Sequence, residues 1–188
     1  MASPAKVRKI AVLGSRAVGK SSLTVQYVEN HFAETYYPTI ENTFQKTMRH
    51  PTTHHEYLLE IYDTAGQDEY SILNSKHALG IHGYMLIYSV ASRASFEMCS
   101  VVRDKILNYT GMEWVPLVLV GNKLDLHQQR QVESSEAEAL AKEWNCATVE
   151  CSAKLNQGVA KAFETMLMEI EKQTSGDAEP PKKGCVIQ

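Results

Sequence analysis

The segment GSRAVGKS at residues 14–21 has the residue types and spacing of a phosphate-binding loop, G-x-x-x-x-G-K-[ST]. Glycines let main-chain N–H groups converge on anionic oxygens, and the start of the following helix adds partial positive charge. Lys20 is expected to reach the β- and γ-phosphates, and the Ser21 hydroxyl to bind Mg²⁺. The motif predicts a nucleoside triphosphate site without specifying the base, with contacts from Ser15, Arg16, Ala17, Val18, Gly19, Lys20, Ser21 and Ser22.

A second motif, DTAG at residues 63–66, directly follows a predicted strand. The Asp63 carboxylate is suited to hold Mg²⁺ through water. Gly66 has no Cβ, so its N–H can approach the γ-phosphate. The pattern D-x-x-G is common by itself, as a strand-to-turn junction. Combined with the upstream phosphate loop, it strengthens the prediction of a magnesium–triphosphate site.

Two further motifs, NKLD at residues 122–125 and SAK at residues 152–154, indicate which base is bound. The Asp125 carboxylate accepts two hydrogen bonds, and guanine offers adjacent donors where adenine has no such pair. Adenine would leave that carboxylate unpaired, which is costly. Asn122 is expected to tie this loop to the phosphate loop, Lys123 to lie over the base and the Ala153 N–H to meet guanine O6. Base contacts are therefore predicted from Asn122, Lys123, Asp125, Ser152, Ala153 and Lys154.

Composition limits the function classes. The chain has 188 residues and a formal net charge of −3, and it contains neither a basic stripe for nucleic acid nor a membrane-spanning apolar run. The N-terminus lacks a signal-peptide core, so a reducing compartment is expected. Cys99, Cys146 and Cys151 have no zinc-type spacing and are expected to pack as small apolar residues. The His54-His55 pair is expected at a solvated hairpin tip.

Strand and helix patterns alternate along the chain, which predicts an α/β fold with a largely parallel sheet. The two strands around residues 51–55 should pair as an antiparallel hairpin. The expected strands are Lys6–Leu13, Asn42–His50, Glu56–Tyr62, Gly83–Val90, Val115–Val120 and Ala147–Glu150. Helices are expected at Ser22–Glu29, near Asp68–Leu79, at Ala94–Tyr109, after a Ser135–Glu138 capping box, and along the stripe Val159, Phe163, Leu167 and Ile170.

The last sixteen residues differ in composition from the rest. From Gln173 onward, Ser, Gly, Pro, Lys and Asp dominate, and such a tail buries too little apolar surface to order itself. The expected organisation is a flexible N-terminus at residues 1–5, one nucleotide-binding domain at residues 6–172 and a disordered tail at residues 173–188.

The order GxxxxGKS, T, DxxG, NKxD, SAK resembles that of the Ras superfamily of small GTPases and covers nearly the whole chain from Lys6. Within it, the chain is most similar to the Rheb subfamily, on Arg16, on PTIENTF at residues 38–44 and on DTAGQDEYS at residues 63–71. The resemblance implies the three-layer P-loop NTPase fold: six strands, mostly parallel with one antiparallel hairpin strand, and helices on both faces. Two departures are a hairpin about two residues longer, and Tyr37 where an acidic residue is usual.

The resemblance also implies roles for individual residues. Thr39 would bind Mg²⁺ and touch the γ-phosphate in the GTP state, Phe32 would stack edge-on against guanine, and Tyr36 would cover the phosphates. Pro38, two residues further on, would also contact the nucleotide. Tyr36–Phe44 and Gln67–Leu73 would be switch segments that bind effectors. The implied partners are a TOR-type kinase complex and a tuberin-like GTPase-activating protein.

Hydrolysis requires a group that orients water, and Gln67 is the candidate. The Arg16 guanidinium either crowds Gln67 and any inserted arginine, or donates to the phosphates in cis. We favour crowding, because the resemblance implies slow intrinsic hydrolysis with weak dependence on Gln67. In that subfamily, the resemblance implies that Tyr36 and a residue from the activating protein contribute more to hydrolysis than Gln67 does. The catalytic candidates are thus Gln67, Tyr36, Lys20 and Arg16, and a switch residue without catalytic function remains an alternative for Gln67.

The C-terminal CVIQ, with Cys185, fits the C-a-a-X signal for a prenyltransferase, and the final Gln favours farnesyl. One lipid chain and the pair Lys182-Lys183 anchor only weakly. We expect reversible attachment to cytoplasmic membrane faces, with a cytosolic pool, and a monomer.

Three functions compete. The first is a timed signalling GTPase, favoured by Thr39, Asp63 and Gln67. The second is a constitutively GTP-loaded binding module, favoured by Arg16. The third, an ATP-dependent kinase or ATPase, is disfavoured by NKLD and by the lack of lid and substrate domains.

Overall fold

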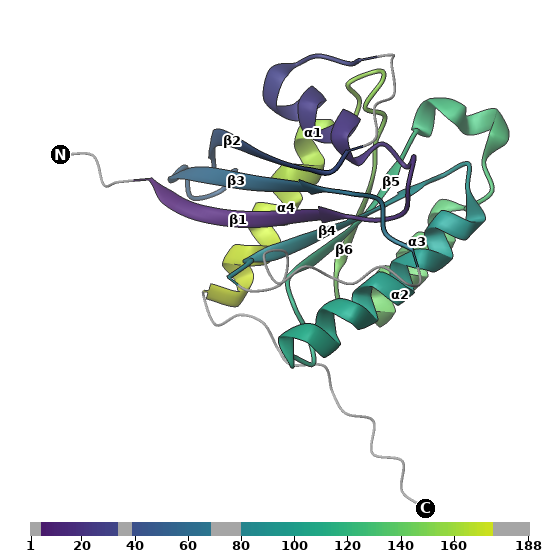
Figure 1. Ribbon diagram of the computed structural model, residues 1–188. Coiled ribbons are helices and arrows are strands. Elements are labelled where there is room, and N and C mark those ends of the chain that lie inside the picture. The colour runs from purple at the N-terminus through teal and green to yellow at the C-terminus, as the bar shows by residue number, and fades with distance from the viewer. Residues whose placement is uncertain (1–4, 34–38, 69–79, 175–188) are drawn as a thin grey trace, which may run out of the picture.

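The computed structural model describes residues 5–33, 39–68 and 80–174 (Figure 1). Within these ranges strands alternate with helices except for β2, β3 and β4, which follow one another. The elements, in order, are β1 (Lys6–Leu13), α1 (Lys20–Glu29), β2 (Glu41–Arg49), β3 (Glu56–Thr64), β4 (Gly83–Ser89), α2 (Arg93–Thr110), β5 (Leu117–Asn122), the 3-10 helix η2 (Leu124–Gln129), α3 (Ser134–Glu143), β6 (Ala147–Glu150) and α4 (Val159–Thr174).

The six strands form one sheet in the order β2-β3-β1-β4-β5-β6. The pairs β1–β3, β1–β4, β4–β5 and β5–β6 are parallel. The hairpin pair β2–β3 is antiparallel, with Glu41 opposite Thr64 and Arg49 opposite Glu56. The predicted α/β architecture, a mostly parallel sheet with one antiparallel hairpin strand, is therefore confirmed.

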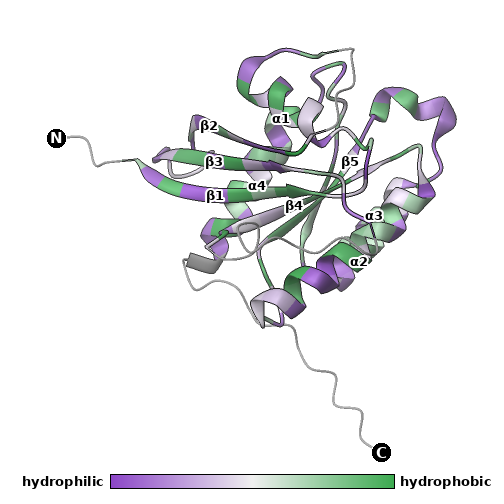
Figure 2. Ribbon diagram, in the orientation of Figure 1, coloured by the Kyte–Doolittle hydropathy of each residue, from purple (hydrophilic) through white to green (hydrophobic). Residues whose placement is uncertain are grey.

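Helices cover both faces of the sheet, so the core has two halves (Figure 1). On one face α1 and α4 pack against the sheet through Leu23, Tyr27, Phe163 and Met166. On the other face α2 and α3 pack through residues that include Phe96, Val102, Ala137 and Trp144. Every residue of β4 and of β5 is buried, as expected for strands covered on both sides. Figure 2 shows the hydropathy of each residue along these strands and the helices around them.

The start of α3 corrects one prediction. The capping box is formed by Glu133 and Glu136, not by Ser135 and Glu138. The Glu136 carboxylate accepts a hydrogen bond from the Glu133 N–H at 3.0 Å and also pairs with Arg93 at 2.6 and 2.8 Å. A carboxylate can cap a helix as a hydroxyl can. The additional ion pair from α2 therefore favours the earlier start.

Other boundaries differ by one or two residues. β5 begins at Leu117, because Pro116 has no N–H to donate to a neighbouring strand. α1 begins at Lys20, two residues earlier than expected, and α4 continues to Thr174. The helix expected near Asp68–Leu79 lies almost wholly outside the described residues.

The predictions for the His54-His55 pair and for three cysteines are confirmed. His54 and His55 are exposed at the β2–β3 turn. Cys99 and Cys151 are buried, and Cys146 is half-buried. Among the described residues, no helix combines the length and apolar character needed to cross a membrane.

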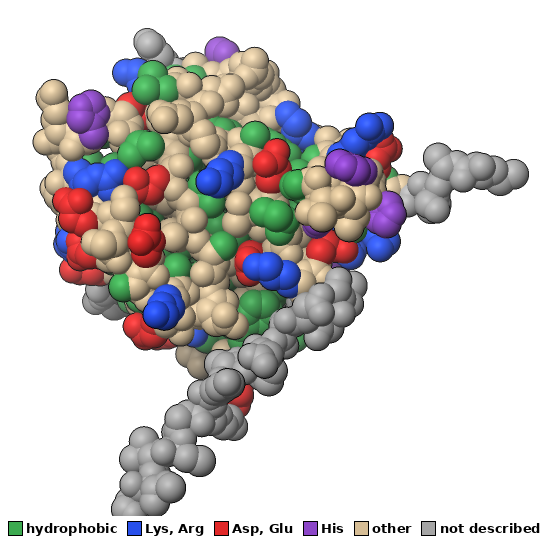
Figure 3. Space-filling view, turned by 180° about the vertical axis from the view of Figure 1, so that it is seen from behind, with side chains coloured by type: hydrophobic (Ala, Val, Ile, Leu, Met, Phe, Trp, Pro, Cys, Tyr) green, Lys and Arg blue, Asp and Glu red, His purple; other side chains and the backbone are tan. Residues whose placement is uncertain are grey.

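Figure 3 shows the molecule from behind, where Lys and Arg side chains are interspersed with Asp and Glu.

Candidate nucleotide-binding site

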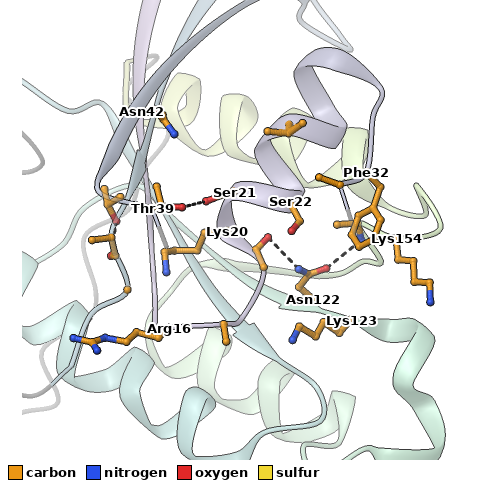
Figure 4. A pocket seen from close by; sticks show the side chains of 18 of the residues that line it. Arg16, Lys20, Ser21, Ser22, Phe32, Thr39, Asn42, Asn122, Lys123 and Lys154 are labelled. Carbon is orange, nitrogen blue, oxygen red and sulfur yellow. Dashed lines mark hydrogen bonds between the residues drawn. The ribbon is translucent and has the colours of Figure 1, made fainter. Parts of the chain in front are cut away.

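A cavity of about 770 Å³ lies at the carboxyl ends of β1, β3 and β5 (Figure 4). This edge of an open α/β sheet is where loops with free N–H groups meet, and it is the usual place for a ligand. The phosphate loop, the DTAG motif and the NKLD motif all line it, although they are far apart in the sequence.

Lys20 lies at the centre of the phosphate loop. Its Nζ donates to the main-chain oxygens of Gly14 at 3.0 Å and Ser15 at 2.8 Å. The side chain is buried, and burial lowers its pKa to about 8 although the nearby Asp63 acts to raise it. A phosphate group there would restore the stability of the ammonium ion.

Asn122 joins the base-binding side of the cavity to the phosphate side. Its Nδ2 donates to the Val18 main-chain oxygen at 3.0 Å, and its Oδ1 accepts from the Ala153 N–H at 3.2 Å. Gly19, at φ 92°, lies so close that a Cβ there would meet Asn122 Nδ2 at 2.5 Å. The expected tie between the two loops is present (Figure 4).

Two hydroxyls and a carboxylate form the candidate magnesium site. Ser21 Oγ and Thr39 Oγ1 lie 2.7 Å apart. Asp63 is fully buried, and neither carboxylate oxygen has a hydrogen-bond partner in the described part of the chain. Burial raises the pKa of Asp63. Two neighbours act to lower this pKa. They are the Ser21 hydroxyl, which lies near the carboxylate without forming a hydrogen bond to it, and the Lys20 ammonium. Oxygen ligands of this kind fit Mg²⁺.

Asp125 is held in place by Ser152. The Ser152 hydroxyl donates to Asp125 Oδ1 at 2.5 Å and itself accepts from the Leu155 N–H at 3.1 Å. The Leu124 N–H donates to the Cys151 oxygen at 3.0 Å, which fixes the loop to the end of β6. One carboxylate oxygen of Asp125 is thus engaged, and the side chain lines the cavity.

Gln67 lies next to the cavity without lining it. Its N–H donates to the Gly14 oxygen at 2.9 Å, and its Nε2 donates to the Ala65 oxygen at 3.1 Å. The side chain is 9% exposed and does not line the cavity. Gly66 packs so tightly on the phosphate loop that a Cβ there would meet the Arg16 Cα at 2.6 Å.

Arg16 lines the cavity, but its guanidinium extends away from Lys20 and Asn122 (Figure 4). Nη2 lies 3.4 Å from the Asp68 carboxylate, and the Arg16 side chain is 75% exposed. The guanidinium is therefore engaged with the residue that follows Gln67.

Most predicted site residues lie together, and a few do not. Ser15 and Val18 contribute main-chain oxygens to Lys20 and Asn122, and Ser152 acts through Asp125. Tyr36 and Pro38 lie outside the described residues. Those lining the cavity are Arg16, Ala17, Gly19, Lys20, Ser21, Ser22, Phe32, Thr39, Gly66, Asn122, Lys123, Asp125, Ala153 and Lys154.

Sequence reasoning missed five lining residues: Val25, Ala33, Asn42, Thr64 and Ala65. Thr64 and Ala65 are the variable positions of the DTAG motif, so that motif could have indicated them. Val25 lies one turn into α1. Ala33 and Asn42 carry no signal of their own, because only the fold brings them to the cavity.

The chain matches the Ras family over residues 9–172. Because this is most of its length, the chain belongs to the Ras family, whose members are GTP-hydrolysing enzymes that bind GTP and GDP, typically with Mg²⁺. It is a Rheb-like small GTPase, as its similarity to Rheb-named proteins shows.

The relatives match along almost their whole lengths. The chain is 64% identical to the GTP-binding protein rhb1 of Schizosaccharomyces pombe over 185 residues, which is 98% of this chain and 99% of the relative. It is 55% identical to the small monomeric GTPase RhbA of Aspergillus fumigatus over 100% of both chains. It is 48% identical to the human GTP-binding protein Rheb over 97% of both chains.

Proposed function

We propose that this GTPase is a Mg²⁺-dependent switch whose intrinsic hydrolysis is slow and which depends on an activating protein. The single observation that carries the proposal is the placement of Gln67, which is buried, donates its amide to the Ala65 main-chain oxygen and does not line the cavity. In that position the amide is engaged by the main chain and is not free to orient a water molecule beside a γ-phosphate.

The nucleotide is held by the contacts described above. Lys20 is the cation for the β- and γ-phosphates, and the Gly66 N–H approaches the γ-phosphate. Asp125 accepts from the two guanine donors while Ser152 keeps the carboxylate oriented. Asn122 keeps the base and phosphate loops at a fixed separation, so the two ends of the nucleotide are bound together.

Ser21 and Thr39 would hold Mg²⁺ directly, and Asp63 would hold it through water. The fully buried Asp63 carboxylate has no hydrogen-bond partner among the described residues, which supports this assignment, because a buried charge needs a compensating partner. When bound, Mg²⁺ neutralises charge on the β- and γ-phosphates. Thr39 comes from the segment before β2, so this contact couples the presence of a γ-phosphate to that segment.

Arg16 favours slow hydrolysis because its guanidinium lies beside Asp68, the residue that follows Gln67. This agrees with crowding rather than with donation to the phosphates. An arginine inserted by a partner would meet the same space.

Single-turnover hydrolysis of preloaded GTP tests the proposal. We expect the wild type to be slow, Gln67→Leu to differ little from it, and Arg16→Gly to be faster. A brisk wild-type rate that Gln67→Leu abolishes would refute the proposal.

A constitutively GTP-loaded binding module is the second candidate, favoured by the same withdrawal of Gln67. The two are separated by measuring the nucleotide bound in cells with and without an activating protein. A timed switch shifts from GTP to GDP, whereas a constitutive module stays GTP-loaded.

The proposed effector surface comprises the switch segments Tyr36–Phe44 and Gln67–Leu73. Within the described part of these segments, Ile40 is an apolar side chain with 89% of its surface exposed. Exposed apolar residues beside a nucleotide-sensing loop suit partner binding. We propose a TOR-type kinase complex as effector and a tuberin-like protein as activator, on the basis of the Rheb-like sequence.

We further propose that the chain is prenylated at Cys185, with the cytoplasmic face of membranes and the cytosol as its locations. The CVIQ sequence supports this proposal. Cys185→Ser should move the protein from the membrane to the soluble fraction. Retention of that variant on membranes would mean that the lipid is not the anchor.

A further inference from the structure

Lys105, in the second half of α2, contacts the residue that follows Gln67. Its Nζ donates to the main-chain oxygen of Asp68 at 2.7 Å. The flanking residues Val102 and Ile106 are buried in the core between α2 and the sheet, so the backbone that carries Lys105 is fixed. No sequence motif indicated this lysine, because it lies 37 residues beyond Asp68 on a helix outside the nucleotide motifs.

Two cations therefore hold Asp68 from different elements. Arg16 pairs with the carboxylate across 3.4 Å, with side chains that are 75% and 46% exposed. Ion pairs exposed to this degree contribute little. The contact from Lys105 is partly buried, shorter and charge-assisted, and it engages the main chain rather than a side chain. Of the two contacts with Asp68, the one from Lys105 is therefore the stronger.

The contact between Lys105 and Asp68 also restricts Gln67, because the two residues are neighbours in the chain. Gln67 is already fixed on its other side, where it forms a parallel bridge with Ser15 and donates its N–H to Gly14. Because these contacts fix the direction in which the Gln67 side chain leaves the main chain, we infer that entry of its amide into the cavity requires the main chain at residues 67–68 to rotate. That rotation would break the contact between Lys105 and Asp68.

We propose that Lys105 is a positioning residue that limits the intrinsic rate of GTP hydrolysis by holding the main chain at Asp68 and so keeping Gln67 out of the nucleotide cavity. The inference rests on the proposed role of Gln67 as the group that can orient water. It concerns the equilibrium between a withdrawn and an inserted glutamine, which a charged contact made only in the withdrawn state shifts toward withdrawal.

The test compares wild type with Lys105→Met in two measurements on the full chain. Single-turnover hydrolysis of preloaded GTP should be faster in the variant by about tenfold, the scale of one charge-assisted hydrogen bond. Amide hydrogen exchange at the Gln67 N–H, measured on the GDP-bound form, should also be faster. Lys105→Arg, which retains a cationic donor, should restore most of the wild-type behaviour in both.

Two controls show the route of the effect. In a Gln67→Leu background, Lys105→Met should give no gain in hydrolysis, because the gain requires the glutamine amide. Lys142→Met makes the same substitution at an exposed position on α3 and should change neither measurement.

The outcomes distinguish this inference from the proposed function. If amide hydrogen exchange at the Gln67 N–H is unchanged in Lys105→Met, Lys105 does not fix the main chain there, whatever the hydrolysis rate, and the inference is wrong. If exchange is faster but hydrolysis is unchanged, Lys105 fixes the main chain without limiting the rate of GTP hydrolysis, and the inference is again wrong. A wild type that binds GDP but never hydrolyses GTP refutes the proposed function, while the exchange measurement still reports on Lys105.

Discussion

The hydroxyl oxygens of Ser21 and Thr39 lie 2.7 Å apart, although Ser21 is in the first turn of α1 and Thr39 precedes β2. Beside them lies the buried carboxylate of Asp63, without a hydrogen-bond partner in the described part of the chain. This arrangement joins the segment before β2 to the phosphate loop at the point where a cation would bind.

Thr39→Ala should therefore weaken Mg²⁺ binding in the GTP form, by about tenfold for the loss of one oxygen ligand to a cation. The GDP form should change little, since Thr39 is proposed to engage only with a γ-phosphate present. Titration of Mg²⁺ into each nucleotide form measures this. Thr43→Ala, at an exposed position of β2, is the matched control. Equal weakening in both forms would contradict a state-specific ligand.

Asn122→Ala should accelerate GDP dissociation by at least roughly tenfold, because the variant leaves the buried Val18 oxygen and Ala153 N–H unpaired at about 1–3 kcal/mol each. The loss would separate the base loop from the phosphate loop. Dissociation of a fluorescent GDP analogue gives the rate. An unchanged rate would show that the tie is irrelevant to nucleotide retention.

Nucleotide affinity should fall as the pH rises above about 8. Burial lowers the pKa of Lys20 to about 8, with Asp63 acting to raise it, in the protein without nucleotide. Bound phosphates stabilise the ammonium ion and raise that pKa. Binding thus takes up a proton between pH 8 and the higher value, and affinity falls by up to about tenfold per pH unit there.

Calorimetric titration with GDP near pH 8.5, in two buffers of different ionisation enthalpy, counts the protons directly. A heat that does not depend on the buffer would mean that Lys20 is already charged before binding.

Much of this site could be predicted because its motifs are short and each follows a strand. Lys20, Asp63 and Asn122 lie where their motifs require, and the strand ends bring them to one edge of the sheet. Side-chain direction could not be predicted. Gln67 has the position of a catalytic residue, yet its amide bonds to Ala65. The Gln67 main chain is in turn fixed by the distant Gly14, a contact that spacing along the chain does not encode.

The same limit applies to the fold. Alternating apolar runs predicted the order of strands and helices, because periodicity reflects burial. The capping box of α3 was misplaced because local propensity treats Ser135 as the better cap, whereas Arg93 on another helix stabilises Glu136. The position of this helix start was therefore decided by a contact between two helices, which local sequence signals do not show.

Tyr88→Phe should raise the free energy of unfolding by about 1 kcal/mol, because it removes a polar group that is buried without compensation. The Tyr88 hydroxyl is buried against Gly121 and has no hydrogen-bond partner within the described residues. Burial, followed by the nearby Glu150, raises its pKa.

Denaturant unfolding at a fixed GDP concentration measures the change. Tyr57→Phe is the contrasting variant, since that hydroxyl donates to Glu171 at 2.7 Å, and its unfolding free energy should fall. A loss in Tyr88→Phe as large as that in Tyr57→Phe would mean that the Tyr88 hydroxyl is satisfied after all.

The central claim is that the Asp125 carboxylate, oriented by Ser152, selects guanine. Its most direct test is competition of GTP, ATP and xanthosine triphosphate against labelled GDP, on wild type and on Asp125→Asn. We predict that the wild type takes GTP and rejects ATP. The variant should lose roughly 10²-fold or more in GTP affinity and prefer xanthosine triphosphate, whose 2-oxo group accepts from an amide. A wild type that binds ATP as well as GTP, or a variant with unchanged base preference, would contradict the account.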